Sequence, residues 1–128
     1  MNSENQQIVL PILDEKKITL FMKREDKLHP YISGNKYRKL KYNISDAKTR
    51  EFKKILTYGG AFSNHIAATA YAGKENELQT IGVIRGDELR NKWHENPTLR
   101  FAHANGMQFK FVTREWYRTK ETPEAIRQ

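Results

Sequence analysis

The strongest constraint on the fold of this chain is the segment between residues 55 and 72. It begins with the apolar, β-prone run Ile55–Tyr58, which is followed by Gly59–Gly60 and then by the alanine-rich stretch Ile66–Ala72. An apolar run of this length predicts a short buried strand, two consecutive glycines predict a turn that breaks it, and the alanine-rich stretch predicts a helix. The segment therefore predicts one strand–turn–helix unit.

Similar units extend this alternation along the chain. Strands are expected at residues 17–24, 80–84 and 107–112, and helices are expected to begin near Asn35, at Asn96–Pro97 and at Thr122–Glu124. Strands that alternate with helices through short links predict an α/β fold with a parallel, doubly wound sheet and right-handed crossovers. Because the chain stops just as the last helix begins, we expect this fold to be incomplete.

Size and composition exclude several classes of protein. A chain of 128 residues suffices for one ordinary domain but not for a two-domain enzyme. It has no apolar run long enough to cross a bilayer and a polar N-terminus, so we expect a cytoplasmic protein without a membrane partner. The absence of cysteine excludes disulfides and thiolate metal sites.

The net charge of +8 raises the alternative of a basic module that binds nucleic acid. The lysines and arginines are spread along the whole chain and alternate with acids, as in Lys23–Lys27, and form no dense basic tail. This distribution favours a solvated surface, and we expect no nucleic-acid partner.

The first candidate for chemistry is the segment Gly34–Leu40, which places Lys36 in the first turn of the predicted helix. Gly34 and Asn35 are expected to provide the entry and the cap. The positive end of the helix dipole disfavours an ammonium group and favours the free amine, which is the form that reacts with carbonyl groups. Taken alone, a lysine in a helix is more often a solvated surface residue.

The second candidate is the segment Tyr58–His65. Its small residues let backbone amides approach an anion at a helix N-terminus, and Ser63 and Asn64 add side-chain hydrogen bonds. The alternative is an ordinary junction, because Ser and Asn are common helix caps. The residues around Ser63 do not form a Gly-x-Ser-x-Gly elbow, which argues against a hydrolase triad. The four histidines share no metal-ligand spacing, so no metal is expected.

Together, the two segments resemble fold-type II pyridoxal-phosphate (PLP) enzymes, and more narrowly the family of 1-aminocyclopropane-1-carboxylate deaminase and D-cysteine desulfhydrase. The resemblance covers nearly the whole chain after about residue 20, with both motifs in the family's order and spacing. The stretches that carry it are Lys23–Asp26, His29–Pro30, Ser33–Lys36, Arg38–Leu40, Gly59–His65, Arg85–Glu88, Asn96–Leu99, Gly106–Met107, Phe111–Val112 and Arg114.

The resemblance implies a role for each matching residue. Lys36 would be the Schiff-base lysine that holds PLP and later carries a proton, and Asn64 would donate a hydrogen bond to the ring oxygen of the cofactor. Ser63 would lie beside the substrate, and His65 would lie near the cofactor ring or the substrate carboxylate. The deaminases commonly have glutamine at the position of His65, so the substrate stays open between the two amino acids of the family.

The resemblance also implies an organisation and a reaction. Residues 1–44 would belong to the large PLP domain and residues 45–128 to a small α/β domain, with the rest of the large domain missing. The intact protein would be a homodimer that converts a small amino acid to a 2-oxo acid and ammonia, and the fragment alone would be inactive. The alternatives are another type II PLP dehydratase or sulfur lyase, a basic nucleic-acid-binding module, and a truncated product without function.

Overall fold

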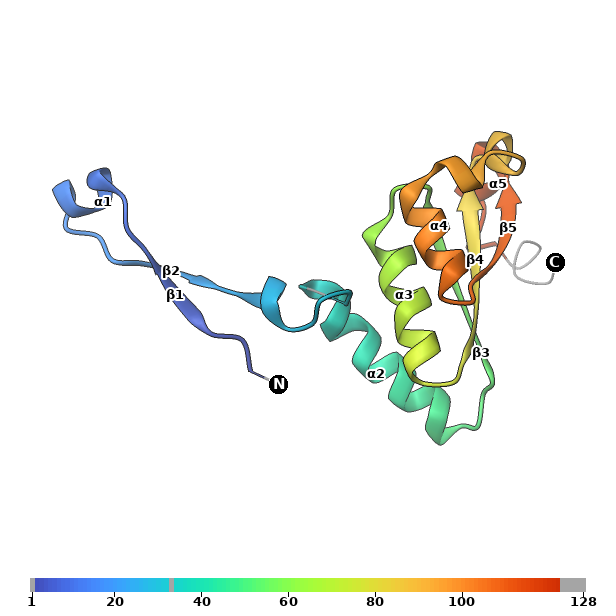
Figure 1. The fold of residues 1–128 in the computed structure, drawn as a ribbon, viewed down its shortest axis with the longest axis horizontal. Coiled ribbons are helices and arrows are strands. Elements are labelled where there is room, and N and C mark those ends of the chain that lie inside the picture. Colours follow the sequence, from blue (N-terminus) through green and yellow to red (C-terminus); the bar gives the residue numbers. More distant parts are fainter. Residues whose placement is uncertain (1, 33, 123–128) are drawn as a thin grey trace.

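The structure, a computed structural model, describes residues 2–32 and 34–122 and consists of an N-terminal hairpin and an α/β body (Figure 1). A long helix, α2, connects the two parts. The strands and helices, in chain order, are β1 (Asn5–Ile8), α1 (Pro11–Glu15), β2 (Leu20–Lys23), α2 (Asn35–Thr49), β3 (Lys54–Gly60), α3 (Asn64–Glu75), β4 (Gln79–Arg85), α4 (Pro97–Ala104), β5 (Gln108–Val112) and α5 (Arg114–Arg118).

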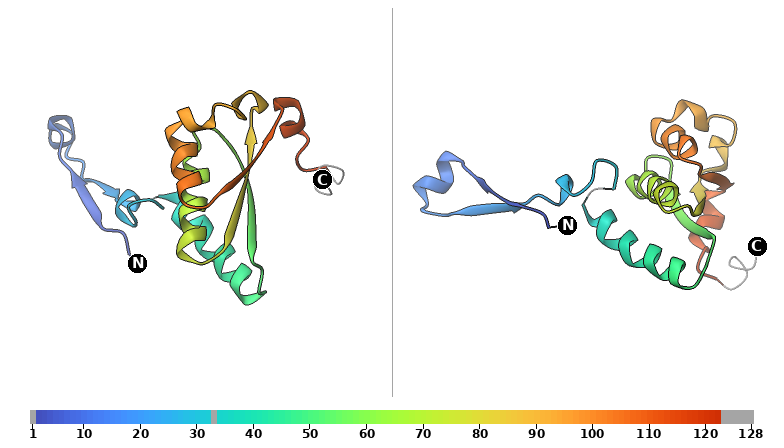
Figure 2. Two further views of the ribbon diagram at one scale, coloured as in Figure 1. Left: turned by 45° about the vertical axis from the view of Figure 1, so that its right-hand side comes forward. Right: turned by 60° about the horizontal axis from the view of Figure 1, so that its bottom comes forward.

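The α/β body contains a parallel sheet of three strands in the order β3-β4-β5. In the register of this sheet Thr57 lies beside Gly82, which lies beside Phe109. Because side chains alternate along a strand, these three residues point to one face, and their neighbours in sequence point to the other. The predicted α/β fold with a parallel sheet is therefore confirmed (Figure 2).

The two crossover helices α3 and α4 cover one face of this sheet. Ile66 of α3 and Leu99 of α4 are completely buried in one cluster with Ile84 of β4. The short helix α5 lies against the opposite face, where the ring of Tyr117 is 6.2 Å from that of Tyr58. The sheet thus has helices on both faces among the described residues, although Leu56 on the α5 side is still 52% exposed.

Helix α2 packs on α3 rather than directly on the sheet. Its apolar stripe, Leu40, Ile44 and Ala47, is buried against Ala68 and Ala72 of α3. The three positions of the stripe follow the spacing of three and four that puts residues on one side of a helix. This packing brings the first turn of α2, with Lys36, towards the first turn of α3.

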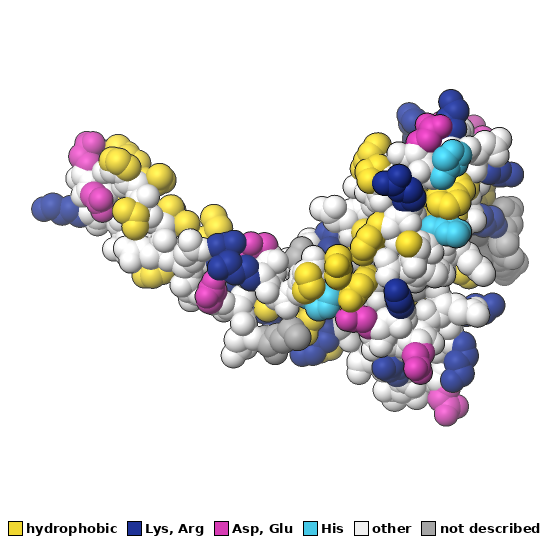
Figure 3. Space-filling model, viewed as in Figure 1, with side chains coloured by type: hydrophobic (Ala, Val, Ile, Leu, Met, Phe, Trp, Pro, Cys, Tyr) yellow, Lys and Arg dark blue, Asp and Glu magenta, His cyan; other side chains and the backbone are white. Residues whose placement is uncertain are grey.

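The hairpin has no core of its own. Its strands pair antiparallel, with Asn5 opposite Lys23 and Ile8 opposite Leu20, and no residue between them is buried. Large apolar side chains therefore line its surface (Figure 3): Val9, Leu10, Ile12, Ile18, Leu20, Phe21 and Met22. An isolated two-stranded hairpin is marginally stable in water, so this part depends on the contacts at its base.

Most predicted elements are confirmed, with three corrections. The strand expected at residues 17–24 is β2, which pairs antiparallel with β1 and does not belong to the parallel sheet. Strand β3 continues through Gly59 and Gly60, which pair with β4, so the glycines do not break the strand. Asn35 does not cap α2, because Gly34 occupies the cap position without a side-chain hydrogen bond. The predicted helix at Thr122–Glu124 extends beyond the described residues.

Candidate functional site

Lys36 and Asn64, two of the three residues expected to bind a cofactor, come from different motifs and line the same open cavity. The volume of this cavity is about 370 Å³, and its walls also include Tyr31, Gly34, Asn35 and Ala67. The size lies within the range of roughly 300–1,000 Å³ that is usual for small-ligand pockets. The fold thus brings one residue of each motif to the same cavity.

The cavity lies where two helices begin. Lys36 is the second residue of α2, and Asn64 is the first residue of α3. Helix N-termini carry partial positive charge and unpaired backbone N–H groups, so both favour an anionic ligand. The Lys36 amine donates a hydrogen bond to Oδ1 of Asn35 at 2.7 Å, which holds it at the cavity wall.

Gly34 gives the chain its path into this cavity. Its backbone has φ 60° and ψ −140°, which a residue with a side chain rarely adopts, and it directly precedes α2. The backbone N–H of Gly34 also donates to the carbonyl oxygen of Glu25 at 2.9 Å. The turn before Lys36 therefore depends on the backbone conformation of Gly34, and its hydrogen bond to Glu25 connects it to the base of the hairpin.

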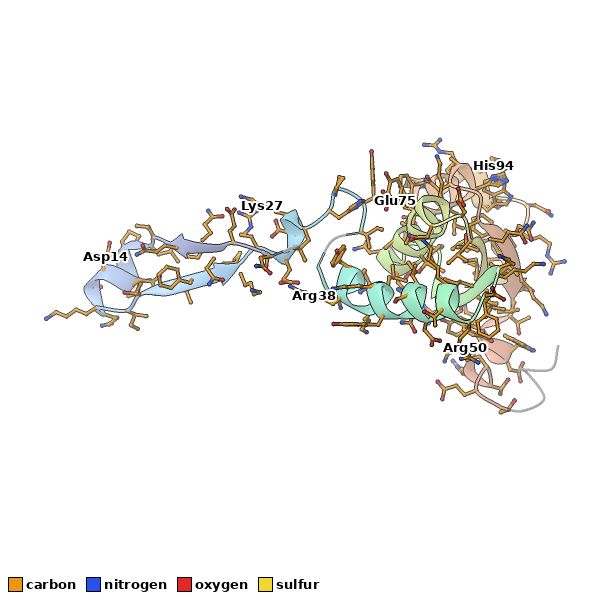
Figure 4. The ribbon with its side chains drawn as sticks, turned by 90° about the horizontal axis from the view of Figure 1, so that it is seen from below. Asp14, Lys27, Arg38, Arg50, Glu75 and His94 are labelled. Carbon is orange, nitrogen blue, oxygen red and sulfur yellow. The ribbon has the colours of Figure 1, made fainter. Side chains whose placement is uncertain are left out.

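The same base is fastened to α2 by an ion pair. Arg38 donates from Nε and Nη2 to the two carboxylate oxygens of Glu25, each at 2.9 Å, and Ser3 donates to one of them at 2.6 Å (Figure 4). These hydrogen bonds, with those from Arg38 largest, lower the pKa of Glu25 from its ordinary 4.5 to about 2. The carboxylate is thus charged at all ordinary pH values.

Ser63 precedes α3 in the cap position, but its side chain makes no capping hydrogen bond. A serine whose only task is to cap a helix accepts a hydrogen bond from a first-turn N–H group. The nearby backbone is unusually tight, because a Cβ atom at Gly59 would lie 2.4 Å from Cγ1 of Ile66. Gly59 thus lets α3 begin close to the sheet, and Ser63 lies at that junction.

His65 is not brought into the cavity with Lys36 and Asn64. It lines a second cavity, between α2 and β3, and its Nε2 atom lies 2.8 Å from Oγ1 of Thr57. Burial lowers the pKa of His65 first, and the positive charges of Lys36 and Lys39 lower it further. The electrostatic effect links the ring to Lys36 although the two side chains face different cavities.

Tyr31 is the cavity residue that sequence reasoning missed. Its ring is half exposed and lies 4.5 Å from the ring of Tyr71 and 5.4 Å from that of Phe101. The only signal in the sequence is its place just before the glycine turn. In residues 2–32 and 34–122, no group of three or more metal-ligating side chains is close enough to hold a metal ion.

The fold and this site define an α/β protein of a kind already known from a solved structure. An ACC deaminase homologue aligns with 88% of this chain at a TM-score of 0.69 and 30% sequence identity. The alignment covers 33% of that longer chain. The α/β fold with a parallel sheet is thus shared with part of an ACC deaminase homologue.

Sequence comparison leads to the same group of proteins. A protein of Pyrococcus furiosus, provisionally named 1-aminocyclopropane-1-carboxylate deaminase, is 39% identical over 75 residues, which are 58% of this chain and 23% of that protein. The bifunctional D-cysteine desulfhydrase/1-aminocyclopropane-1-carboxylate deaminase of Arabidopsis thaliana is 36% identical over 70 residues, 55% of this chain and 18% of that protein. No family model matches the chain.

The resemblance seen in the motifs is confirmed: the chain is similar, over part of its length, to proteins named 1-aminocyclopropane-1-carboxylate deaminase or D-cysteine desulfhydrase. It spans about a fifth of the length of the curated relatives that it matches. No described helix is both long enough and apolar enough to cross a membrane.

Proposed function

We propose that this chain provides the lysine-bearing N-terminal part of a PLP-dependent deaminase or lyase that acts on a small amino acid. With 1-aminocyclopropane-1-carboxylate as the substrate, the reaction would consume water and give a 2-oxo acid and ammonia. With D-cysteine, it would also consume water, and hydrogen sulfide would leave together with the 2-oxo acid and ammonia. The observation that carries this proposal is the meeting of Lys36 and Asn64 in one cavity at the N-termini of two helices. The complete reaction is proposed for this chain together with the remaining part of its relatives' fold.

The residues of the cavity suit the cofactor. PLP offers an aldehyde that an amine can attack, a ring oxygen that accepts hydrogen bonds, and an anionic phosphate. Lys36 supplies the amine, and the side-chain amide of Asn64 can donate to the ring oxygen. When bound, the cofactor serves as an electron sink for the substrate carbon next to the amino group.

The other site residues would act on the substrate. We propose that Ser63, whose hydroxyl is not used as a helix cap, binds the substrate carboxylate or assists ring opening. Lys36, once released from the cofactor, would move a proton at the substrate carbon. His65 would support the cofactor site from the side of the sheet, where its neutral ring bonds to Thr57.

The proposal includes an organisation of domains and partners. Residues 1–44 would belong to the large domain and residues 45–128 to the small one, which places the boundary inside the continuous helix α2. The complete protein would be a cytoplasmic homodimer, without a nucleic-acid or membrane partner. A related type II PLP dehydratase or sulfur lyase is the neighbouring alternative, and a substrate panel on the complete protein would separate these activities.

The test is to add PLP to the chain, reduce with borohydride, and map the labelled peptide. We expect the label on Lys36 and its loss in Lys36→Ala. Lys48→Ala is the matched control, because Lys48 is an exposed lysine at the other end of the same helix. Equal labelling of Lys36 and Lys48 would contradict the proposal, and salt-sensitive binding to nucleic acid without any PLP label would favour the basic module.

A further inference from the structure

The loop that leads into α2 is held by one histidine. His29 lies between the 3-10 turn Glu25–Lys27 and the helix, and its side chain is 15% exposed. Its Nδ1 atom accepts hydrogen bonds from the backbone N–H groups of Tyr31 at 3.1 Å and Ile32 at 3.0 Å. A side-chain acceptor that binds N–H groups two and three residues later is the arrangement by which Asn and Asp stabilise turns.

These bonds define which ring nitrogen of His29 is the acceptor. A backbone N–H group can only donate, so Nδ1 accepts, and Nε2 is the ring nitrogen left to donate. The Nε2 atom is 3.5 Å from Oε1 of Glu75 on α3. The ring also lies 5.4 Å from that of Tyr71, another α3 residue. One side chain therefore joins the loop before Lys36 to the helix that begins with Asn64.

The same bonds determine where Tyr31 lies. Its N–H group is bound by His29, and its half-exposed ring forms part of the cavity that Lys36 and Asn64 line. The neighbouring residue Ile32 is buried in the cluster that joins α2 and α3. The loop is thus held at the backbone by His29, at the core by Ile32, and at its end by the bond from Gly34 to Glu25.

We propose that His29 is a positioning residue for this cavity: it holds the loop so that Lys36 and the ring of Tyr31 face Asn64. The importance of this geometry rests on the proposed function of Lys36, whereas the geometry itself can be tested without the cofactor. The resemblance to the PLP enzymes includes His29–Pro30 among its matching stretches but implies no role for His29.

The experiment measures how fast the Lys36 amine is acylated, without PLP, relative to the exposed Lys48 in the same molecule. His29→Phe keeps an aromatic ring and removes the acceptor, while His29→Asn keeps an acceptor that can bind the same two N–H groups. We expect His29→Phe to move the Lys36:Lys48 ratio by about threefold or more towards one, since two hydrogen bonds are lost. We expect His29→Asn to keep the ratio within about twofold of the native value.

The control is His103→Phe, which replaces an exposed histidine that stacks on Trp93 far from the loop in sequence. It should leave the ratio unchanged, and thermal unfolding of each variant shows whether a change is confined to the loop. An unchanged ratio in a folded His29→Phe variant, or a native ratio already equal to one, would overturn the proposal.

Amide hydrogen exchange and PLP labelling decide the cases that the acylation ratio alone leaves open. If His29→Phe does not fold, amide hydrogen exchange of the native chain replaces it: protected N–H groups of Tyr31 and Ile32 support the proposal, and rapid exchange of both overturns it. A changed ratio in His29→Phe, combined with no PLP label on Lys36 in either this chain or the complete protein, would reject the proposed function and leave the positioning role standing.

Discussion

Lys36 and Asn64 line one cavity although they belong to different helices and to segments separated by an entire strand. Two features produce this meeting. The apolar stripe of α2 packs on α3, and Gly59 lets α3 begin close against the sheet. The site therefore depends on the packing of helices as much as on the residues that line it.

Ser63→Ala tests whether this serine is more than a cap. Because its hydroxyl makes no capping bond, we expect the free energy of unfolding to change by less than about 0.5 kcal/mol. Asn96→Ala is the control, since Asn96 is buried and accepts from the N–H of Leu99 at 3.0 Å; its loss should cost about 1 kcal/mol. Urea denaturation measures both values, and equal losses would identify Ser63 as an ordinary cap.

In the complete protein, Ser63→Ala has a second expected effect. A residue that binds or acts on the substrate should lower turnover far more than it weakens PLP binding. Steady-state kinetics and a PLP titration measure the two quantities separately. A parallel loss of turnover and of cofactor affinity would place Ser63 in the cofactor site instead.

Gly59→Ala should destabilise the junction between β3 and α3. The added Cβ atom would lie 2.4 Å from the side chain of the buried Ile66, and such overpacking costs about 1–3 kcal/mol. At Gly60 the nearest atom to an added Cβ is Nη2 of Arg85 at 3.8 Å, an ordinary contact. Gly60→Ala is therefore the matched control, and a cost as large as that of Gly59→Ala would refute the packing explanation.

Acid should weaken the attachment of the hairpin through Glu25. The pKa of this carboxyl is lowered in the folded chain, so its stabilising contribution is complete above its ordinary value of 4.5 and declines as the pH falls towards about 2. We expect Glu25→Gln to reduce the loss of stability in this pH window. Glu15→Gln, an exposed acid near the hairpin tip, is the comparison, and chemical denaturation at several pH values is the measurement.

The His65 ring should make stability depend on pH in a different range. Its pKa is lowered in the folded chain from the ordinary 6.5, so the unfolded chain binds a proton at pH values where the folded chain does not. Stability should therefore decrease as the pH falls below about 6.5. His65→Gln should flatten this dependence, whereas the exposed-site variant His103→Gln should keep it. Identical pH curves for His65→Gln and the native chain would contradict this assignment.

The sequence was informative where local pattern and packing agree. The spacing of Tyr37, Leu40, Ile44 and Ala47 in the sequence predicts one apolar side of α2; in the structure the last three are buried and Tyr37 is partly buried. Asn96–Pro97 predicted the start of α4, where Asn96 is the observed cap. Lys36 and Asn64 could be selected as candidates because each lies a few residues after a glycine at the predicted start of a helix. Their common cavity is a property of the fold that these patterns alone do not specify.

Other features depend on tertiary contacts and had no clear pattern. Gly59 and Gly60 predicted a break, but pairing with β4 extends the strand through both of them. The polar strand β1 forms only because β2 pairs with it. The place of His65 beside Thr57 follows from the direction in which α3 leaves the sheet. The link from His29 to Glu75 joins residues far apart in the sequence.

The bonds of Glu25 couple the hairpin mechanically to the turn that precedes Lys36. Its carboxylate holds Arg38 on α2, and its backbone carbonyl holds Gly34, two residues before Lys36. The rest of the hairpin extends away from Glu25, and none of its residues between Asn5 and Lys23 is buried. A displacement of the hairpin tip should therefore act through Glu25 on the turn that precedes Lys36.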